Sequence, residues 1–585
     1  MTTYSIFGAG PSGLYTAWRL VTSGKAKSGD TVALYDWGHY DFGDGGTRAP
    51  SGRICTYFYR NDTTQSHIEA GGMRFILWDP AKGEGHQLVT KTIDKLGLTS
   101  KIIPFNTTDN PLLYLREQHI YQNDLSPQNP APYWTPGNNA KPAATLFSNI
   151  SALITGNAPV KTRAQQCQFY SSGTLPDTFN SFVYPPETNA GNVGYWNIFY
   201  DQAGNESYDY ANDAGGYTSN VINWNAANAA VYNGEFAPGG SFKTLKDGYS
   251  EVFYQLYQQT LTAAKQSGVN LTLTQKTRLH SIWLENGAIT YRLANASDPF
   301  VPSTPPMKTD VGFLAMPPNP IQLVAQATRY LDNSGKLDLL NTPQVQLYLQ
   351  SVILQPALRI LLFFDQPWWT STKYPPKLID GQGTPNIYGP TITDIPLRQI
   401  YYFGNNSPAN PNPVYGLLAS YDDMQFTQFW QDLETPAEAR RVVPLSQDYQ
   451  PMIGPRDATA TMIRMVLLEL AKVHYGDPNA AGQIPTPLEA KYMDFSLNPC
   501  AAGYHAWASH YNICHVMQTI RKPTQLLPGN DAPLYIIGEA FSNDQGWVEG
   551  AFCTAESVLN DFLGVPTIAD TTNYPLICGC SSGGG

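Results

Sequence analysis

The chain has 585 residues, of which 42% are hydrophobic and 12% aromatic, enough for several large apolar cores. Only 14% are charged, and the net charge of −11 argues against a nucleic-acid partner, because phosphate binding needs clustered lysine and arginine. The apolar runs fall far short of the roughly 20 residues of a membrane-spanning helix. We expect no signal peptide ahead of the first strand, hence a cytoplasmic protein, with secretion left open.

The first segments along the chain predict a βαβ unit. Residues 4–7 form an apolar, β-prone run, residues 14–21 have helical apolar spacing, and residues 31–35 form a second β-prone run. Asp36 follows that second run directly. It stands 23 residues after Gly13, close to the roughly 20 expected for a carboxylate that binds ribose hydroxyls.

A glycine motif, G-x-G-x-x-G at Gly8, Gly10 and Gly13, joins the first strand to the helix. Gly8 permits a tight turn, Gly10 lets a pyrophosphate approach the backbone, and Gly13 lets the helix pack close to the strand. The helix N-terminus presents free N–H groups and its positive dipole end to phosphates. The order strand, glycines, helix, strand and acid therefore predicts a dinucleotide site.

The rest of the chain alternates between loop-rich and regular segments, with no repeat of 20–50 residues. Residues 122–240 are rich in Asn, Pro, Gly, Ala and Tyr, and we expect loops and short helices inserted as a cap. Helices are predicted at 245–264, 459–474 and 546–563. Strands are predicted at 269–274, 281–285, 288–293, 310–315 and 533–537, with a hairpin turn at Asn286-Gly287. The β-prone runs 357–365 and 415–421 fit a second, mixed sheet.

Three further segments join the opening motif. Arg53, shortly after the second strand, can reach a pyrophosphate as a fixed positive fork. Gly71 and Gly72 let the backbone approach a flat ring closely. Residues 534–551 repeat the order strand, glycine loop, helix, which would place a second helix N-terminus at the other end of the dinucleotide.

Taken together, Gly-Ala-Gly-Pro-Ser-Gly at 8–13, Gly-Gly-Met-Arg at 71–74, and Gly-Glu-x-x-Ser with Gly-Trp-Val-Glu-Gly in 538–550 resemble the flavin-containing amine oxidase superfamily. Within it they resemble the L-amino-acid oxidases. The similarity covers most of the chain and is concentrated at residues 4–75, 238–320, 356–430 and 500–563.

This resemblance implies an α/β fold with an α+β substrate domain. A discontinuous Rossmann-like FAD-binding domain (1–64, 238–330 and 525–570) would be interleaved with a mixed-sheet substrate-binding domain (65–121 and 331–524). A helical cap (122–237) and a flexible tail (571–585) would complete the chain. The domains interleave because one dinucleotide site draws on both ends of the sequence.

The resemblance also implies the chemistry. FAD would accept a hydride from the substrate C–N unit at flavin N5, and O2 would reoxidise it to give hydrogen peroxide. An L-α-amino acid would yield a 2-oxo acid and ammonia. We expect FAD to be bound non-covalently, because residues 541–547 beside the flavin ring contain no cysteine.

Residue by residue, the resemblance assigns cofactor contacts along the whole dinucleotide. They are Gly8, Gly10, Ser12 and Gly13 on the pyrophosphate, Asp36 on the adenosine ribose, Arg53 on the phosphates, Leu279 on adenine, Gly72, Met73 and Arg74 on the isoalloxazine, Gly538 and Glu539 at a ribityl or phosphate-side hydroxyl, and Val548 at the flavin carbonyl end.

The substrate contacts follow in the same way. Arg74 would form a bidentate pair with the substrate carboxylate, and Tyr421 would donate a second hydrogen bond to it. The alternatives are an internal ion pair for Arg74 and ordinary sheet packing for Tyr421. Trp547 would lie beside the reacting amine, with the Gly546 carbonyl accepting from its nitrogen. Tyr504, His505 and Trp507 would line the side-chain end of the pocket. The alternative for His505 is a packed, hydrogen-bonded residue, which a lone histidine in such a loop more often is.

The sequence departs from the family in two places. Arg359 stands where many members have a lysine near flavin N5, and arginine stays protonated, so it cannot act as a neutral base. It could orient water or stabilise the reduced flavin. No histidine lies between His119 and His280, so the cap supplies no histidine base. The amine would enter neutral or lose its proton to water.

Several alternatives stay open at this point. A monoamine or polyamine oxidase, an amino-acid 2-monooxygenase and a flavoprotein that binds FAD only for structure share the same motifs. The preferred side chain is not determined. We expect a small amino acid and O2 as partners, no nucleic acid, no membrane and no metal, and a homodimer, since paired assemblies are common in the family.

Seven dispersed cysteines do not predict a disulfide framework. Cys578 and Cys580 precede Ser-Ser-Gly-Gly-Gly, which predicts a flexible tail. The alternative is a metal or redox role for this pair.

Overall fold

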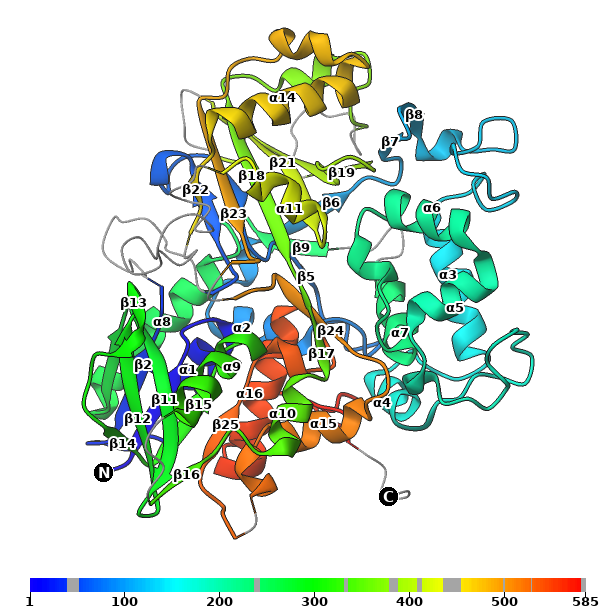
Figure 1. Ribbon diagram of the computed structural model, residues 1–585. Helices are drawn as coiled ribbons and strands as arrows, with labels where there is room; N and C mark the ends of the chain where they lie inside the picture. Colours follow the sequence, from blue (N-terminus) through cyan, green and yellow to red (C-terminus); the bar gives the residue numbers. More distant parts are fainter. Residues whose placement is uncertain are drawn as a thin grey trace.

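The computed structural model of the protein describes residues 1–38, 52–235, 242–330, 335–377, 388–407, 413–434, 454–497, 500–527 and 529–579 (Figure 1). Ser51, just before Arg53, and Cys580 of the predicted tail lie outside these ranges. None of the helices in the described ranges is long and apolar enough to cross a membrane.

A five-stranded parallel sheet carries the first glycine motif. Its order is β10 (Asn270–Thr274), β2 (Thr31–Tyr35), β1 (Thr3–Phe7), β15 (Val311–Leu314) and β25 (Leu534–Ile536). Helix α1 (Pro11–Thr22) packs against α8 (Glu251–Ser267) and α16 (Val548–Leu563), and α16 packs against α2 (Gln87–Lys95). The βαβ unit is confirmed, and its strands are buried on both faces, as parallel strands require.

Two glycines explain how α1 meets this sheet. Gly8 has a φ of 117°, and a side chain there would collide with the Ala315 carbonyl. A side chain at Gly13 would collide with the Gly8 carbonyl. The close packing of helix on strand that the motif predicts is therefore confirmed.

A second, antiparallel sheet stands beside the first. It contains β11 (Thr277–Glu285), β12 (Ala288–Asn295), β13 (Asp298–Pro302), β14 (Met307–Thr309) and β16 (Lys336–Asp338). The hairpin between β11 and β12 is confirmed, because Asn286 and Gly287 have φ values of 52° and 78°, as a two-residue type I′ turn needs. Helix α9 (Pro318–Arg329) packs on β11.

The predicted mixed sheet is also confirmed, and it is the largest in the described ranges, with eleven strands. They are β22 (Arg456–Asp457), β23 (Glu489–Asp494), β18 (Ala357–Phe364), β21 (Tyr415–Asp423), β20 (Gln399–Gly404), β19 (Tyr388–Thr393), β6 (Ile102–Thr107), β9 (Phe242–Leu245), β5 (Phe75–Ile76), β7 (Leu112–Leu115) and β8 (Gln118–Tyr121). Strand β19 runs parallel to β6 and β7, whereas β18, β20 and β21 are antiparallel neighbours.

Further strands and helices lie outside these three sheets. They are β3 (Thr56–Phe58), β4 (His67–Glu69), β17 (Val352–Gln355), β24 (Tyr504–Trp507), α10 (Pro343–Leu349), α11 (Phe426–Gln431), α14 (Ala460–Tyr475) and α15 (Ile513–Ile520). Helix α14 confirms the helix predicted at 459–474, with the Thr459 hydroxyl accepting from the Met462 N–H as its N-cap.

One predicted helix starts too early. The segment 245–264 was expected to be helical throughout, but Leu245 ends β9 and α8 begins only at Glu251. Gly248, with a φ of 85°, makes the turn between them. Residues 242–245 therefore pair with β5 and β6 of the large sheet.

The inserted segment forms a group of helices on one side of the molecule, beside the large sheet (Figure 1). They are α3 (Ala143–Thr155), α4 (Arg163–Ser172), α5 (Tyr195–Ala203), α6 (Asn205–Gly215) and α7 (Ala226–Glu235), with a 3-10 turn η5 (Thr218–Val221) between α6 and α7. We call this group the cap.

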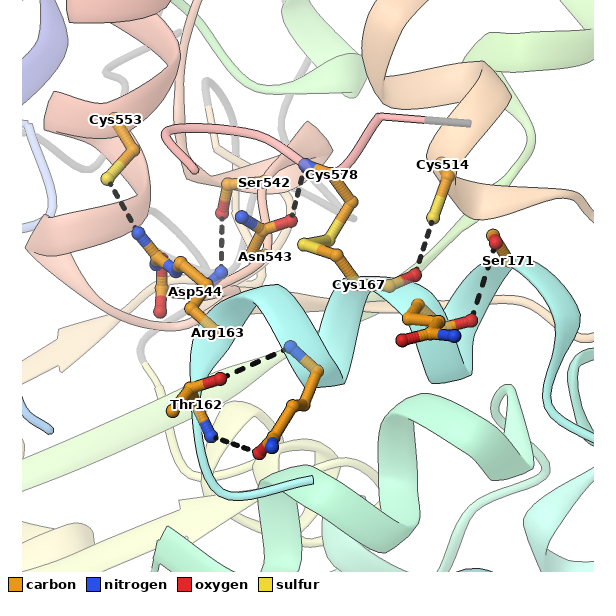
Figure 2. Close-up of a disulfide and its surroundings, with 12 residues drawn as sticks. Thr162, Arg163, Cys167, Ser171, Cys514, Ser542, Asn543, Asp544, Cys553 and Cys578 are labelled. Carbon is orange, nitrogen blue, oxygen red and sulfur yellow. Dashed lines mark hydrogen bonds and ion pairs between the residues drawn. A yellow bond between two sulfur atoms is a disulfide. The ribbon is translucent and has the colours of Figure 1, made fainter. Parts of the chain in front are cut away.

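The described part of the predicted tail is packed, which corrects the expectation of a flexible end for residues 571–579. Tyr574 is buried, and its hydroxyl donates to Glu549 Oε1 at 2.7 Å. Cys578 is fully buried and forms a disulfide with Cys167 of α4 (Figure 2). The two cysteines are 411 residues apart in sequence, so their spacing gave no signal of the pair.

Candidate active site

One cavity collects nearly all the residues that the sequence singles out. Its lining includes Gly8, Gly10, Ser12, Asp36, Arg53, Gly72, Met73, Arg74, Leu279, Arg359, Tyr421, Tyr504, Gly538, Glu539, Gly546, Trp547 and Val548. Gly13 lies outside the lining because it packs α1 on β1. The cavity therefore runs from the glycine loop after β1 to the face of β18 and β21.

Two helix N-termini meet the cavity, one at each end. Gly10 is the N-cap of α1 and Trp547 is the N-cap of α16, and neither helix has a side-chain hydrogen bond at its cap. Free N–H groups and the dipole of a helix N-terminus favour an anion. Among the described residues, a side chain at Gly10 would meet only the Gly52 Cα, at 3.8 Å, and Gly10 lines the cavity.

Asp36 is held rigidly at the tip of β2. Its Oδ2 accepts from the Ala9 N–H at 2.6 Å, and its Oδ1 accepts from the Gly38 N–H at 2.6 Å. These bonds tie the acid to the glycine loop, and the residue lines the cavity together with Leu279. The position fits a ribose contact, which stays a prediction.

Glu539 joins Arg53 and His505 in a cluster at the cavity wall, in which Glu539 and His505 are buried and Arg53 is half-buried. Glu539 Oε1 accepts from Arg53 Nη1 at 2.6 Å and lies 2.6 Å from His505 Nδ1, and Oε2 accepts from the Gly546 N–H at 3.1 Å. Burial would raise the pKa of Glu539, but His505 and Arg53 lower it to about 2. Both carboxylate oxygens of Glu539 therefore accept hydrogen bonds from protein groups, and these bonds hold Arg53 at the cavity wall.

The turn at Gly71 and Gly72 needs glycine for a reason beyond the predicted approach to a flat ring, which stays a prediction. The Gly71 N–H donates to the Cys55 carbonyl at 3.0 Å and the Gly72 N–H to the Arg53 carbonyl at 2.9 Å. A side chain at Gly71 would collide with this backbone. The turn is thus packed tightly against the protein as well as facing the cavity.

Arg359 supports the same turn from β18. Its Nη1 donates to the carbonyls of Glu69, at 3.2 Å, and Gly71. Its guanidinium lies 4.1 Å from the centre of the Tyr421 ring. These contacts hold the guanidinium at the cavity wall.

Arg74 is surrounded by aromatic rings. Its guanidinium lies 4.1 Å from the Phe242 ring centre and 5.4 Å from that of Phe105. Its Nη1 donates to the Tyr401 hydroxyl at 3.4 Å. Within the described ranges it makes no ion pair with a carboxylate, which argues against the internal ion pair as the reason for this residue.

Tyr421 and Trp547 form two further walls. The Tyr421 ring meets the Tyr217 ring edge to face at 5.3 Å, so a residue of the cap closes this side. The Trp547 ring stacks on Phe242 at 6.0 Å. Gly546, with a φ of 81°, leaves the Tyr232 hydroxyl only 3.2 Å from where a Cβ would be.

Of the three residues predicted for the side-chain end, only Tyr504 lines the cavity. Successive residues of β24 point to opposite faces. His505 therefore lies behind the wall, paired with Glu539, and the Trp507 indole is fully buried and donates to the Ser542 carbonyl at 3.0 Å. The predicted pocket roles of His505 and Trp507 are corrected accordingly.

The cap supplies lining residues that the sequence did not reveal. They are Tyr217, Ser219, Asn220 and Tyr232. The Ser219 hydroxyl lies 2.8 Å from the Tyr504 hydroxyl, which also donates to Asp423 Oδ2 at 3.2 Å. The only signal in the sequence was the high aromatic content of the insertion.

Comparisons with known proteins agree with this architecture. No protein-family model matches the chain. Aplysianin-A of Aplysia kurodai is 23% identical over 96% of this chain and 90% of its own length. L-amino-acid oxidase 4 of Hebeloma cylindrosporum is 25% identical over 36% of this chain and 29% of its own length.

Among solved structures, putrescine oxidase bound to putrescine has the same fold. Its TM-score is 0.58 at 13% identity, over 96% of this chain and 99% of the other. With the glycine cradle, the two helix N-termini and the near full-length sequence similarity, these findings support the flavin-containing amine oxidase superfamily for this chain.

Proposed function

We propose that the protein is an FAD-dependent L-amino-acid oxidase. It would convert an L-α-amino acid, O2 and water into a 2-oxo acid, ammonia and hydrogen peroxide. Superfamily membership supports an oxidative flavoenzyme, and the choice of an amino acid over a simple amine depends on one residue, Arg74.

The observation that carries the proposal is the position of the Arg74 guanidinium. It lines the cavity, and its contacts within the described ranges are the Tyr401 hydroxyl and the rings of Phe105, Phe242 and Tyr401. Arg74 is half-buried, and a cation that is partly removed from water is stabilised by an anion. A substrate carboxylate would supply that anion in bidentate geometry.

Other residues of the cavity lining fit FAD. The α1 N-terminus and Arg53 would bind its pyrophosphate, Asp36 its ribose and Leu279 the adenine, while Gly72, Met73 and the α16 N-terminus would meet the flavin ring. When bound, FAD supplies the acceptor for the substrate hydride and the site of reoxidation by O2. With no cysteine in residues 541–547, we propose that it is held non-covalently.

The chain's own groups would then orient the substrate. Arg74 and Tyr421 would fix the carboxylate, and the Gly546 carbonyl would accept from the amine beside Trp547. Arg359 would remain a cation, because its proton is not available as a base. His505 is held by Glu539, so we propose that the amine enters neutral or loses its proton to water.

A peroxide-coupled screen of the loaded enzyme tests this proposal. Twenty L-amino acids and their decarboxylated amines would be compared, with 2-oxo acid, ammonia and carbon dioxide measured in parallel. We expect peroxide and a 2-oxo acid from at least one L-amino acid. Oxidation of amines alone would indicate a monoamine or polyamine oxidase, and carbon dioxide with an amide would indicate a 2-monooxygenase.

A homodimer stays a prediction, which sedimentation would test.

A further inference from the structure

We propose that Gln399 is a positioning residue, which links the cap to the Arg74 guanidinium through Tyr401. The proposal rests on the proposed role of Arg74 as the carboxylate anchor. It assigns to the cap a part in substrate binding beyond covering the cavity.

The contact between Gln399 and the cap is closely fitted. Gln399 is the first residue of β20, is 1% exposed, and donates from Nε2 to the Gly216 carbonyl at 3.0 Å. Gly216 ends α6 with a φ of 76°. A Cβ there would lie 3.0 Å from Gln399 Cγ and 3.1 Å from its Nε2, so a larger residue would displace the amide.

This contact fixes which way the amide faces. The Gly216 carbonyl can only accept a hydrogen bond, so it must meet the NH2 group of Gln399. Oε1 is then turned to the other side, where it accepts from the Tyr401 hydroxyl at 2.9 Å. Gln399 and Tyr401 are two residues apart on one strand and therefore share a face.

The Tyr401 hydroxyl in turn fixes Arg74. A tyrosine hydroxyl has a single proton, and here that proton is committed to Gln399. Its lone pairs remain for Arg74 Nη1, 3.4 Å away. Tyr401 is 1% exposed, so no bulk water replaces either bond. The chain Gly216, Gln399, Tyr401 and Arg74 is thus polarised in one direction, from cap to anchor.

The cap is also held at a second point, which makes the proposal testable. Asp423 at the end of β21 accepts from the Thr218 N–H at 3.0 Å and the Ser219 N–H at 2.8 Å. These bonds are independent of Gln399. We therefore expect the cap to stay docked when Gln399 is replaced. The Tyr401 hydroxyl proton could then turn toward the Arg74 guanidinium, which would weaken carboxylate binding by Arg74.

The test is an equilibrium titration of the FAD-loaded protein with benzoate, followed by the flavin absorbance. In Gln399→Met and Tyr401→Phe the benzoate Kd should rise about three- to tenfold, the effect of one buried hydrogen bond. The double variant should lose less than the sum of the two single variants, because both changes break the same Gln399–Tyr401 hydrogen bond. Gln399→Glu keeps the acceptor but cannot donate to Gly216, and should also weaken benzoate.

Tyr402→Phe is the matched control. Its hydroxyl is equally buried on the same strand, but it bonds Thr391 Oγ1 at 2.8 Å and His474 Nε2 at 3.1 Å, away from the cavity. It should leave the benzoate Kd unchanged. Thermal unfolding and flavin content of every variant show whether the fold is retained.

The outcomes separate the two proposals. If Arg74→Ala weakens benzoate while Gln399→Met and Gln399→Glu bind it as the parent does, the positioning role is wrong and the anchor stands. If Arg74→Ala leaves the benzoate Kd unchanged, the anchor itself is wrong. Additive effects in the double variant, or an equal loss in Tyr402→Phe, would also overturn the positioning role.

Discussion

The two ends of the cavity are built in different ways. At the cofactor end, the glycine loop and the acid each follow directly on a strand of the parallel sheet, as Gly8 follows β1 and Asp36 follows β2. At the substrate end, side chains converge from distant segments, as when Asp423 accepts from the Thr218 N–H 205 residues away. Changes at one end should therefore leave the other end intact, and the predictions below test that separation.

The largest effect is expected for Arg74→Ala. Removing one partner of a buried, hydrogen-bonded charge pair costs about 2–5 kcal/mol of transition-state binding. kcat/KM for L-amino acids should fall accordingly, while decarboxylated amines should be affected far less. Steady-state kinetics on matched substrate pairs measures this, and the flavin spectrum is the control. A variant that keeps FAD and oxidises amino acids like the parent would remove the basis for the amino-acid preference.

The Cys167–Cys578 disulfide should stabilise the fold without affecting substrate or cofactor binding. Cys578→Ala frees the C-terminal segment from α4, and the loss of such a link costs about 2–4 kcal/mol. We expect a lower melting temperature with unchanged KM and FAD content. Thermal unfolding with and without a dithiol reductant is the measurement. The reductant should lower the melting temperature of the parent but not that of the variant, and an insensitive parent would contradict the pairing.

Asp36→Ala tests the cofactor end alone. It removes charge-assisted hydrogen bonds worth about 1.5–3 kcal/mol, so FAD affinity should fall roughly ten- to a hundredfold. The loss includes the acceptors of the Ala9 and Gly38 N–H groups. With FAD in excess, KM for the amino acid should match the parent. Unchanged FAD affinity would show that the Asp36 carboxylate only accepts the backbone N–H groups of Ala9 and Gly38 and does not bind the ribose.

Lowering the pH should remove the stabilising effect of the Glu539 carboxylate. Because the pKa of Glu539 is lowered from 4.5 to about 2, its stabilising effect is complete above pH 4.5 and is lost as the pH falls toward 2. The unfolding free energy of the parent should therefore drop more steeply across this window than that of Glu539→Gln. Denaturant unfolding at a series of pH values gives both slopes. Parallel profiles would mean that the carboxyl titrates normally.

The smallest effect is expected for Arg359→Lys. Arg359 donates to two backbone carbonyls below the Gly71 turn, and a lysine can keep the charge and one such bond. Activity should stay within about tenfold of the parent, with any loss in KM if the turn moves. Rapid-reaction measurements of flavin reduction and reoxidation would show whether either step depends on the guanidinium. Normal values of both, with normal KM, would exclude Arg359 from the site.

The sequence alone determined the βαβ unit, the glycine motifs and most of the cavity lining. These features depend on local backbone geometry and on residues that stand next to each other in the chain, such as Gly8, Gly10 and Asp36. The strands 357–365 and 415–421 were also predictable, because apolar β-prone runs of that length are buried wherever they pair.

Only the tertiary structure decided the rest. It brought Gly216 against Gln399, joined Cys167 to Cys578, and turned His505 and Trp507 behind the wall that Tyr504 forms. Spacing along the chain does not encode which distant elements pack together or which face of a short strand meets the cavity. Those choices follow from the packing of the cap, the large sheet and the C-terminal segment on one another.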